Sequence, residues 1–293
     1  MLGRRAINRG TGILCIATAA VLWGTWPLYA RADGPAPEVV AFLTMLVMSV
    51  PSLFVFRRSD FADRGAVLAL VVVGVSDAAN VALYFPAIAR GPAVVAVLTH
   101  YLAPTLVTLA APRLLGEPRS RRVLPASALI LTGLGLVLGA GGHTGGWLTT
   151  AALGGGSAVF YALNVLGSRR AGRTFSPLAV TARHAVVSAL ALLAFYGRSA
   201  LPTAFDASTR FVLLGALLNG LVGALLFNVA LKRLTAQLVG VITYLEPLTA
   251  AALGVLVLGQ PFTPWSALGA ALVIAAGGWA ASERPISGRG SSA

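Results

Sequence analysis

Ten long apolar runs, separated by short polar stretches, constrain this chain more than any other feature of its sequence. A helix needs about 20 apolar residues to cross a bilayer. The predicted spans cover residues 11–30, 37–56, 65–89, 92–112, 123–141, 147–168, 176–197, 209–231, 236–258 and 264–281. They leave almost no residues for a soluble domain. The sequence therefore predicts an all-α integral membrane protein that forms one membrane domain.

The composition excludes several classes of protein. Hydrophobic residues make up 57% of the chain and charged residues 11%, which excludes a soluble enzyme and a disordered chain. The net charge of +13 does not indicate a nucleic-acid partner, because the basic residues lie in short clusters between apolar runs and so direct membrane topology. The single cysteine, Cys15, excludes a disulfide within the chain and a cysteine-based zinc site. No metal and no cofactor is expected.

The loop charges predict the orientation in the membrane. If the N-terminus is cytoplasmic, 17 Lys and Arg residues fall on the inside and 4 on the outside, as the positive-inside rule requires. Both termini are therefore expected in the cytoplasm. The N-terminal segment imitates a signal peptide, with Arg4 and Arg5 before an apolar stretch, but it is long enough to be a retained first helix. The excess of Arg over Lys, with abundant Ala, Gly and Val, favours a bacterial inner-membrane protein.

An internal repeat appears when the chain is shifted by 143 residues. Residues 91–118 then lie over 234–261, with Tyr101 and Pro104 opposite Tyr244 and Pro247. Apolar helices resemble one another by composition, but the common register of these residues favours a true repeat. The halves are expected at 1–141 and 147–281, followed by a cytoplasmic tail at 282–293. Five spans in each half make the second half inverted, and such transporters bind substrate near the midplane.

Several short motifs make the sequence resemble a known family. Leu22-Trp23-Gly24-Thr25, Tyr244-Leu245-Glu246-Pro247 and Gly259-Gln260-Pro261, together with ten spans, are similar to the EamA type of the drug/metabolite transporter superfamily. The stretch His100–Pro104 most resembles the aromatic amino-acid exporters of that superfamily. The resemblance implies export of small metabolites by alternating access, through a central cavity lined mainly by helices 1, 3, 4, 6, 8 and 9. One departure is that Ala103-Pro104 replaces the Glu-Pro pair in the fourth helix.

Polar residues within the apolar runs are the candidate site residues, because intramembrane ionisable groups are costly and mark function. Asp77, Asn80 and Tyr84 share one helix face. The residues expected to line the cavity are Trp26, Asp77, Asn80, Tyr84, His100, Tyr101, Tyr161, Asn164, Asn219, Tyr244 and Glu246. Three prolines are expected to mark bends that gating would use: Pro86, Pro104 and Pro247.

Each candidate also has a purely structural interpretation. The polar stripe of the third span could join helices, the tyrosines could pack around the bends, and His100 could be a satisfied packing residue. Glu246 could be a buried pair member or a protonated acid. Arg183 and His184 are expected near the cytoplasmic end of the seventh span, where an arginine can reach the interface. Glycines in the fifth and tenth spans predict helix packing or a dimer surface.

Three functions remain open on the sequence alone. A secondary transporter that exports amino acids, aromatic or neutral, or related metabolites fits best, and its partners would be the small-molecule substrate and the lipid bilayer. Efflux of cationic or lipophilic drugs by the same fold is the second. A membrane enzyme or a lipid flippase is the third, but the polar residues lie mid-span on several helices rather than near one interface. Direct use of ATP is excluded because the sequence has no Walker loop.

Overall fold

The computed structural model describes residues 2–29, 34–55, 62–90, 93–138, 146–203, 206–258 and 263–283, and these residues form helices joined by short connections. The helices in chain order are α1 (Leu2–Gly24), α2 (Trp26–Tyr29), α3 (Pro37–Ser49), η1 (Val50–Leu53), α4 (Arg64–Arg90), α5 (Ala93–His100), α6 (Ala103–Leu115), α7 (Val123–Leu138), α8 (Trp147–Ala171), α9 (Pro177–Tyr196), η3 (Gly197–Ala200), α10 (Ala207–Gly215), η4 (Ala216–Gly223), α11 (Ala224–Arg233), α12 (Ala236–Ile242), α13 (Leu245–Leu258) and α14 (Pro264–Ala281).

These helices confirm the ten predicted spans. Eight helical stretches in the described residues are long and apolar enough to cross a membrane, and the shorter apolar helices Pro37–Leu53 and Val123–Leu138 complete the set. Six of the spans consist of consecutive helices: α1 with α2, α3 with η1, α5 with α6, α9 with η3, α10 with η4 and α11, and α12 with α13. The chain is thus a multi-pass membrane protein built from two five-helix halves.

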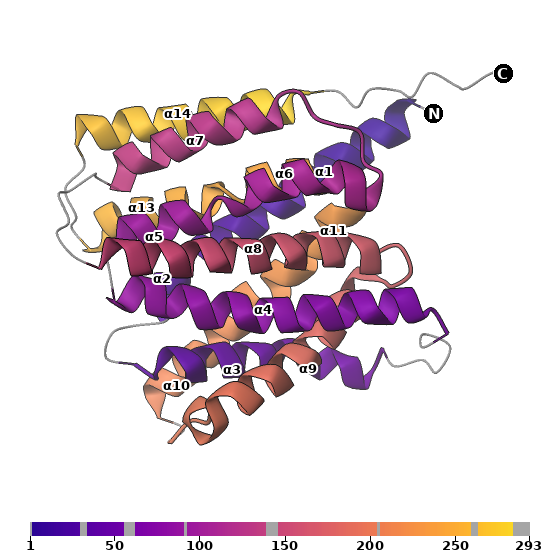
Figure 1. Cartoon of the computed structure of the whole chain (residues 1–293), viewed down its shortest axis with the longest axis vertical. Coiled ribbons are helices and arrows are strands. Elements are labelled where there is room, and N and C mark those ends of the chain that lie inside the picture. The colour runs from indigo at the N-terminus through magenta and orange to yellow at the C-terminus, as the bar shows by residue number, and fades with distance from the viewer. Residues whose placement is uncertain are drawn as a thin grey trace.

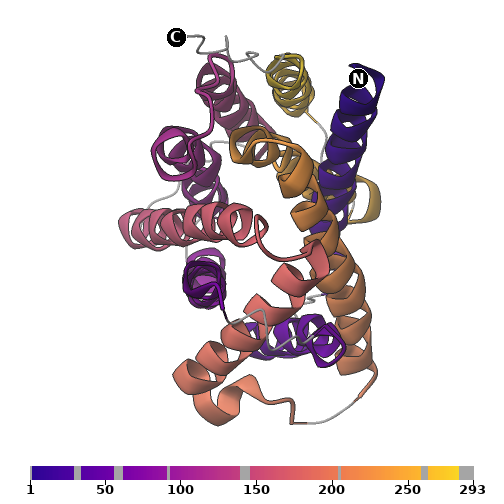
Figure 2. The ribbon, with the colours of Figure 1, turned by 90° about the vertical axis from the view of Figure 1, so that its right-hand side faces the viewer.

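The packing of the helices follows the repeat. Helix α1 belongs to the first half and packs against α11 and α13 of the second half. Its counterpart in the second half, α8, packs against α4 and the α5–α6 span of the first half. The remaining counterparts pack on each other, α3 on α9 and α7 on α14. Figure 2 shows α4 lying between α8 and α9. Helices of the two halves therefore interlock, and each half completes the other's core.

Two glycines explain the contact between α7 and α14. A Cβ on Gly133 would lie 2.7 Å from the Gly269 carbonyl oxygen, and a Cβ on Gly269 would lie 2.4 Å from the Gly133 carbonyl oxygen. Only glycine allows backbones to approach so closely, as in other membrane helix pairs. At this position the predicted glycine surface is a packing surface within the chain.

Two spans are interrupted at repeat-related positions. The α5–α6 span breaks at Tyr101 and Leu102, and the α12–α13 span breaks at Thr243 and Tyr244. Each break lies just before a proline, which cannot donate the backbone hydrogen bond of a regular helix. In the second break the Thr243 carbonyl accepts a hydrogen bond from the N–H of Glu246 at 2.9 Å. By contrast, α4 continues without a break through Pro86.

The two ends of the described chain lie at the same end of the bundle (Figure 1). The Arg9 guanidinium donates to the carbonyls of Ala281 and Glu283, at 2.7 and 2.6 Å. An even number of spans requires this placement, because each crossing reverses the direction of the chain.

Candidate functional site

A stack of three rings lies where α4, α5 and α8 meet. The His100 ring is 4.1 Å from the Tyr84 ring and 5.3 Å from the Tyr161 ring, centroid to centroid, with interplanar angles of 26° and 16°. The imidazole is therefore held between two phenol rings from different helices. Such offset stacking contributes about 0.5–1.5 kcal/mol per pair beyond burial. We call Tyr84, His100 and Tyr161 the ring stack.

Ser157 fixes the His100 ring within this stack. The Nδ1 of His100 lies 2.6 Å from the Ser157 hydroxyl, which itself donates to the Gly154 carbonyl at 3.1 Å. Because a serine hydroxyl has one proton, donation to Gly154 makes the His100 Nδ1–H the donor to Ser157. A serine within a membrane helix often bonds only its own backbone, so nothing in the sequence identifies Ser157 as the partner of His100.

The repeat-related tyrosines meet at the two helix breaks. The Tyr244 hydroxyl donates to the Tyr101 carbonyl at 2.8 Å, and their ring centroids are 5.6 Å apart. Tyr101 also packs edge-on against His100, at 5.1 Å and 90°. Both tyrosines are buried in an apolar cluster with α7 and α14. They therefore join the ring stack to the protein core and connect one helix break to the other.

Glu246 lies in the first turn of α13 and faces the rings. Its carboxyl group lies close to the Tyr101 side chain, and its charge is felt at Tyr84 and Tyr161. Within the described part of the chain, no basic side chain forms an ion pair with it. A helix N-terminus favours a negative charge, but a carboxylate inside a membrane normally has a partner. The site therefore offers an acceptor for a cationic group.

A second polar contact joins α4 to α9. The Asp77 carboxylate lies 3.4 Å from the Nε2 of His184, and the Nδ1 of His184 lies 2.7 Å from the Val180 carbonyl. His184 is thus within the protein, paired with a predicted site residue, rather than only near a membrane surface. One helical turn from Asp77, the buried Oδ1 of Asn80 has no hydrogen-bond partner in the described residues.

The other predicted site residues lie outside the ring stack. Asn219 is fully buried in the π-helical segment η4, where its carbonyl accepts from the Trp23 indole at 2.8 Å and its Oδ1 lies 3.2 Å from the Thr25 hydroxyl. Trp26 packs with α3 and α10 and edge-on against Tyr29. Asn164 is buried on α8.

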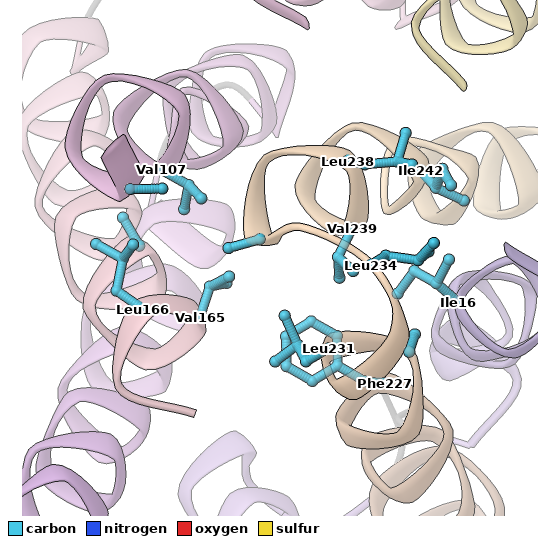
Figure 3. Packing of buried hydrophobic residues seen from close by; sticks show 14 of the residues in the cluster. Ile16, Val107, Val165, Leu166, Phe227, Leu231, Leu234, Leu238, Val239 and Ile242 are labelled. Atoms are coloured by element: carbon cyan, nitrogen blue, oxygen red, sulfur yellow. The ribbon is translucent and has the colours of Figure 1, made fainter. Parts of the chain in front are cut away.

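An apolar cluster packs the helices together at one end of the bundle. Side chains of α6 and α8 face those of α11, α12 and α1 (Figure 3). The labelled members are Ile16, Val107, Val165, Leu166, Phe227, Leu231, Leu234, Leu238, Val239 and Ile242. All are buried, with relative exposure of at most 7%. We call the end of the bundle that carries this cluster, and at which α1 begins and α14 ends, the closed end.

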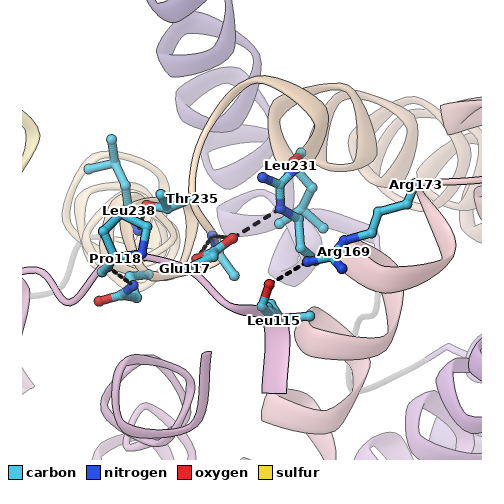
Figure 4. A network of polar contacts seen from close by, with 10 residues as sticks. Leu115, Glu117, Pro118, Arg169, Arg173, Leu231, Thr235 and Leu238 are labelled. Atoms are coloured by element: carbon cyan, nitrogen blue, oxygen red, sulfur yellow. Dashed lines mark hydrogen bonds and ion pairs between the residues drawn. The ribbon is translucent and has the colours of Figure 1, made fainter. Parts of the chain in front are cut away.

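A polar network covers the apolar cluster at the closed end (Figure 4). Glu117, in the loop after α6, pairs with the Nε of Arg169 at 3.0 Å and accepts the backbone N–H of Ala236 at 2.9 Å. Arg169 also donates to the Leu231 carbonyl, and Arg173 donates to that of Leu115. Glu117 thus ties the first half to two helices of the second.

Glu283 ties the C-terminal end of α14 to the loop before α7. It accepts hydrogen bonds from the Ser120 hydroxyl and from the backbone N–H of Arg121. Burial raises the pKa of the Glu283 carboxyl, but the hydrogen bonds from Ser120, Arg121 and Arg122 outweigh it and hold the pKa below its usual value. The carboxylate form is therefore the one that fastens this end of the bundle.

Comparison with known proteins places both halves in one family model. Residues 10–139 and 148–277 each match the model described as the EamA-like transporter family. An uncharacterized protein of Pseudomonas aeruginosa, PA1977, is 32% identical over 130 residues, which are 43% of this chain and 45% of that protein. A crystal structure described only as that of a protein matches with a TM-score of 0.76 and 21% identity, over 93% of this chain and 96% of the other. At that identity the likeness is one of fold.

Proposed function

Because the chain belongs to the EamA-like transporter family, we propose that it exports amino acids or related small metabolites that carry an ammonium group. The observation that carries this proposal is Glu246, an intramembrane carboxylate without an ion-pair partner among the described residues, facing the ring stack. An ammonium group would supply the missing positive charge. The aromatic rings around it would add cation–π attraction.

The ring stack suits the rest of such a substrate. Tyr84 and Tyr161 are half-buried, whereas Tyr101 and Tyr244 are almost fully buried. A neutral or aromatic side chain would therefore lie against Tyr84 or Tyr161, and the phenol hydroxyls would donate to a substrate carboxylate. Tyr101 and Tyr244 would act as positioning residues, since Tyr101 lies beside Glu246 and the Tyr244 hydroxyl donates to the Tyr101 carbonyl.

The arrangement of the halves supports alternating access. Interrupted helices that meet at the interface of inverted repeats are a common feature of secondary transporters. Here the breaks before Pro104 and Pro247 meet beside the ring stack. In this proposal Glu117 and the apolar cluster form a gate at the closed end. The charge distribution of the loops supports a cytoplasmic location for that end, in a bacterial inner membrane.

Efflux of organic cations is the second candidate, and the same carboxylate supports it. An aromatic site with one acidic group would hold a lipophilic cation as well as an amino acid. The two functions differ in what the substrate needs. An amino acid needs donors for its carboxylate, whereas a quaternary ammonium compound needs only Glu246 and the rings.

Uptake by proteoliposomes of the purified protein would test the proposal. Labelled phenylalanine, tryptophan and threonine are offered in turn, with empty liposomes as the control. We expect saturable phenylalanine uptake that unlabelled amino acids reduce and that tetraphenylphosphonium reduces weakly. Uptake of labelled tetraphenylphosphonium without any amino-acid uptake would replace the first function with the second. No uptake of either compound by folded protein would contradict both.

A further inference from the structure

We propose that Asp77 and His184 form a proton-binding site between the two halves, which couples transport to the proton gradient. The pair lies within the spans α4 and α9, with Asp77 from the first half and His184 from the second. The proposed function does not need this site, because Glu246 and the ring stack lie elsewhere. The coupling role does rest on the proposed function, whereas the proton site itself does not.

The hydrogen bond to Val180 determines how the pair holds its proton. A carbonyl oxygen only accepts, so the Nδ1 of His184, at 2.7 Å, must carry a proton. The Nε2 therefore faces Asp77 either as the N–H of an imidazolium or as a bare lone pair. In the first state the carboxylate is ionised, and in the second the carboxylic acid must donate. In both states the pair binds one proton more than a neutral histidine beside an ionised Asp77 would.

Loss of that proton would change the contact between the helices. A carboxylate would then face the lone pair of a neutral imidazole, and one negative charge would be left without compensation. The Asp77 side chain is 16% exposed and that of His184 is 5% exposed, so the charge would be poorly solvated where it stands. Release of the proton would therefore favour separation of the two side chains.

The backbones of α4 and α9 are in close contact at this level. A Cβ on Gly74, one turn before Asp77, would lie 2.6 Å from the His184 carbonyl oxygen and 2.5 Å from the Cβ of Val187. Repulsion between Asp77 and His184 would therefore act directly on the contact between these two helices. Since the helices belong to opposite halves, the proton would act on the movement that alternating access needs.

Tyr161 links the pair to the proposed substrate site. Among the titratable groups on the helices packed against α4, Tyr161 on α8 lies near enough to both Asp77 and Glu246 to be within reach of their charges. His100 on α5 lies between the two rings of the stack. Tyr161 is therefore the side chain of the ring stack that lies between the pair and Glu246 in this network of charges.

The other charged groups on the neighbouring helices are directed elsewhere or lie at helix ends. Arg183, next to His184, donates to the Val55 carbonyl, and its guanidinium lies 5.0 Å from the centroid of the Phe175 ring. The remaining charged residues on α3, α4, α8, α9, η3 and α11 are at or near the ends of those helices: Glu38, Arg64, Arg90, Arg169, Arg170, Arg198, Lys232 and Arg233.

A spectroscopic experiment reads the proton site without any substrate. Protein with ¹⁵N-labelled histidine is followed by NMR over a pH series, and His184→Gln assigns the signals. We expect a protonated Nδ1 of His184 throughout the series. Asp77→Asn should change the pH response of the His184 signals while the His100 signals keep theirs. A His184 without a proton on Nδ1, or an unchanged pH response in Asp77→Asn, would overturn the site.

Transport with a pH gradient tests the coupling. In proteoliposomes, a gradient should stimulate phenylalanine uptake by the wild type and by the control Glu38→Gln, which lacks a carboxylate at the start of α3. His184→Gln should retain exchange of phenylalanine across the membrane and lose the stimulation. Gradient-driven uptake that persists in His184→Gln would refute the coupling while the proposed function stands. If neither the wild type nor any variant takes up phenylalanine, the proposed function fails. The NMR experiment then still decides whether the proton site exists.

Discussion

Glu246→Gln is expected to reduce uptake of an organic cation to the level of empty liposomes and to slow phenylalanine uptake about tenfold. The substitution keeps the size of the side chain and removes the carboxyl group that lies beside Tyr101 and the ring stack. A hydrogen bond to a charged group contributes about 1.5–3 kcal/mol. Phenylalanine would retain its contacts with the rings and with donors to its carboxylate, whereas a cation would lose its only counter-charge.

The matched control is Glu38→Gln, which removes a carboxylate from the first turn of α3 and should transport like the wild type. Size-exclusion chromatography establishes that both variants are folded. Uptake by Glu246→Gln at the wild-type rate, for both compounds, would mean that Glu246 is only a structural group at the start of α13.

Glu117→Ala is expected to lower the free energy of unfolding by about 3 kcal/mol, because removing one member of a buried ion pair leaves the other without compensation. The Glu117 side chain is 6% exposed, and it satisfies both Arg169 and the N–H of Ala236. Arg169 is 26% exposed and can turn partly to water, so the loss should lie at the lower end for buried pairs. Denaturant unfolding in detergent, followed by circular dichroism, measures it.

A second variant separates the ion pair from the rest of the loop. Glu117→Ala combined with Arg169→Leu should be more stable than Glu117→Ala alone, because no unpaired guanidinium remains. The single cysteine, Cys15, packs against the apolar cluster of the closed end, so its reaction with a maleimide reports opening. Glu117→Ala should react faster than the wild type. Equal stability and equal labelling would show that Glu117 does not hold this end closed.

The sequence predicts the fold well because its signals are long and redundant. Ten apolar runs, the loop charges and the register of Pro104 with Pro247 all agree, and the helices confirm the spans and the two halves. The register also predicts that Tyr101 and Tyr244 approach from opposite halves, and their hydroxyl–carbonyl contact shows that they meet.

The site is predicted less completely because a pattern on one helix does not determine its rotation against the next. The stripe with Asp77 and Tyr84 indicates an inward face, but nothing in it identifies His184 as the partner of Asp77. Local irregularities in a helix also change which way its side chains face. The first span turns at Thr25, so Trp26 lies with α3 and α10 rather than with the rings. The π-helical segment around Asn219 likewise shifts its face.

Whether the ring stack and Glu246 receive the substrate can be measured by equilibrium binding of labelled phenylalanine to the purified protein. Tyr161→Leu removes one ring of the stack while retaining an apolar side chain, and Phe195→Leu removes an exposed ring at the end of α9. We expect Tyr161→Leu to weaken binding about tenfold, as for loss of a well-packed aromatic contact, and Phe195→Leu to bind like the wild type. Equal affinity in the wild type and in Tyr161→Leu would mean that the substrate does not bind at the ring stack.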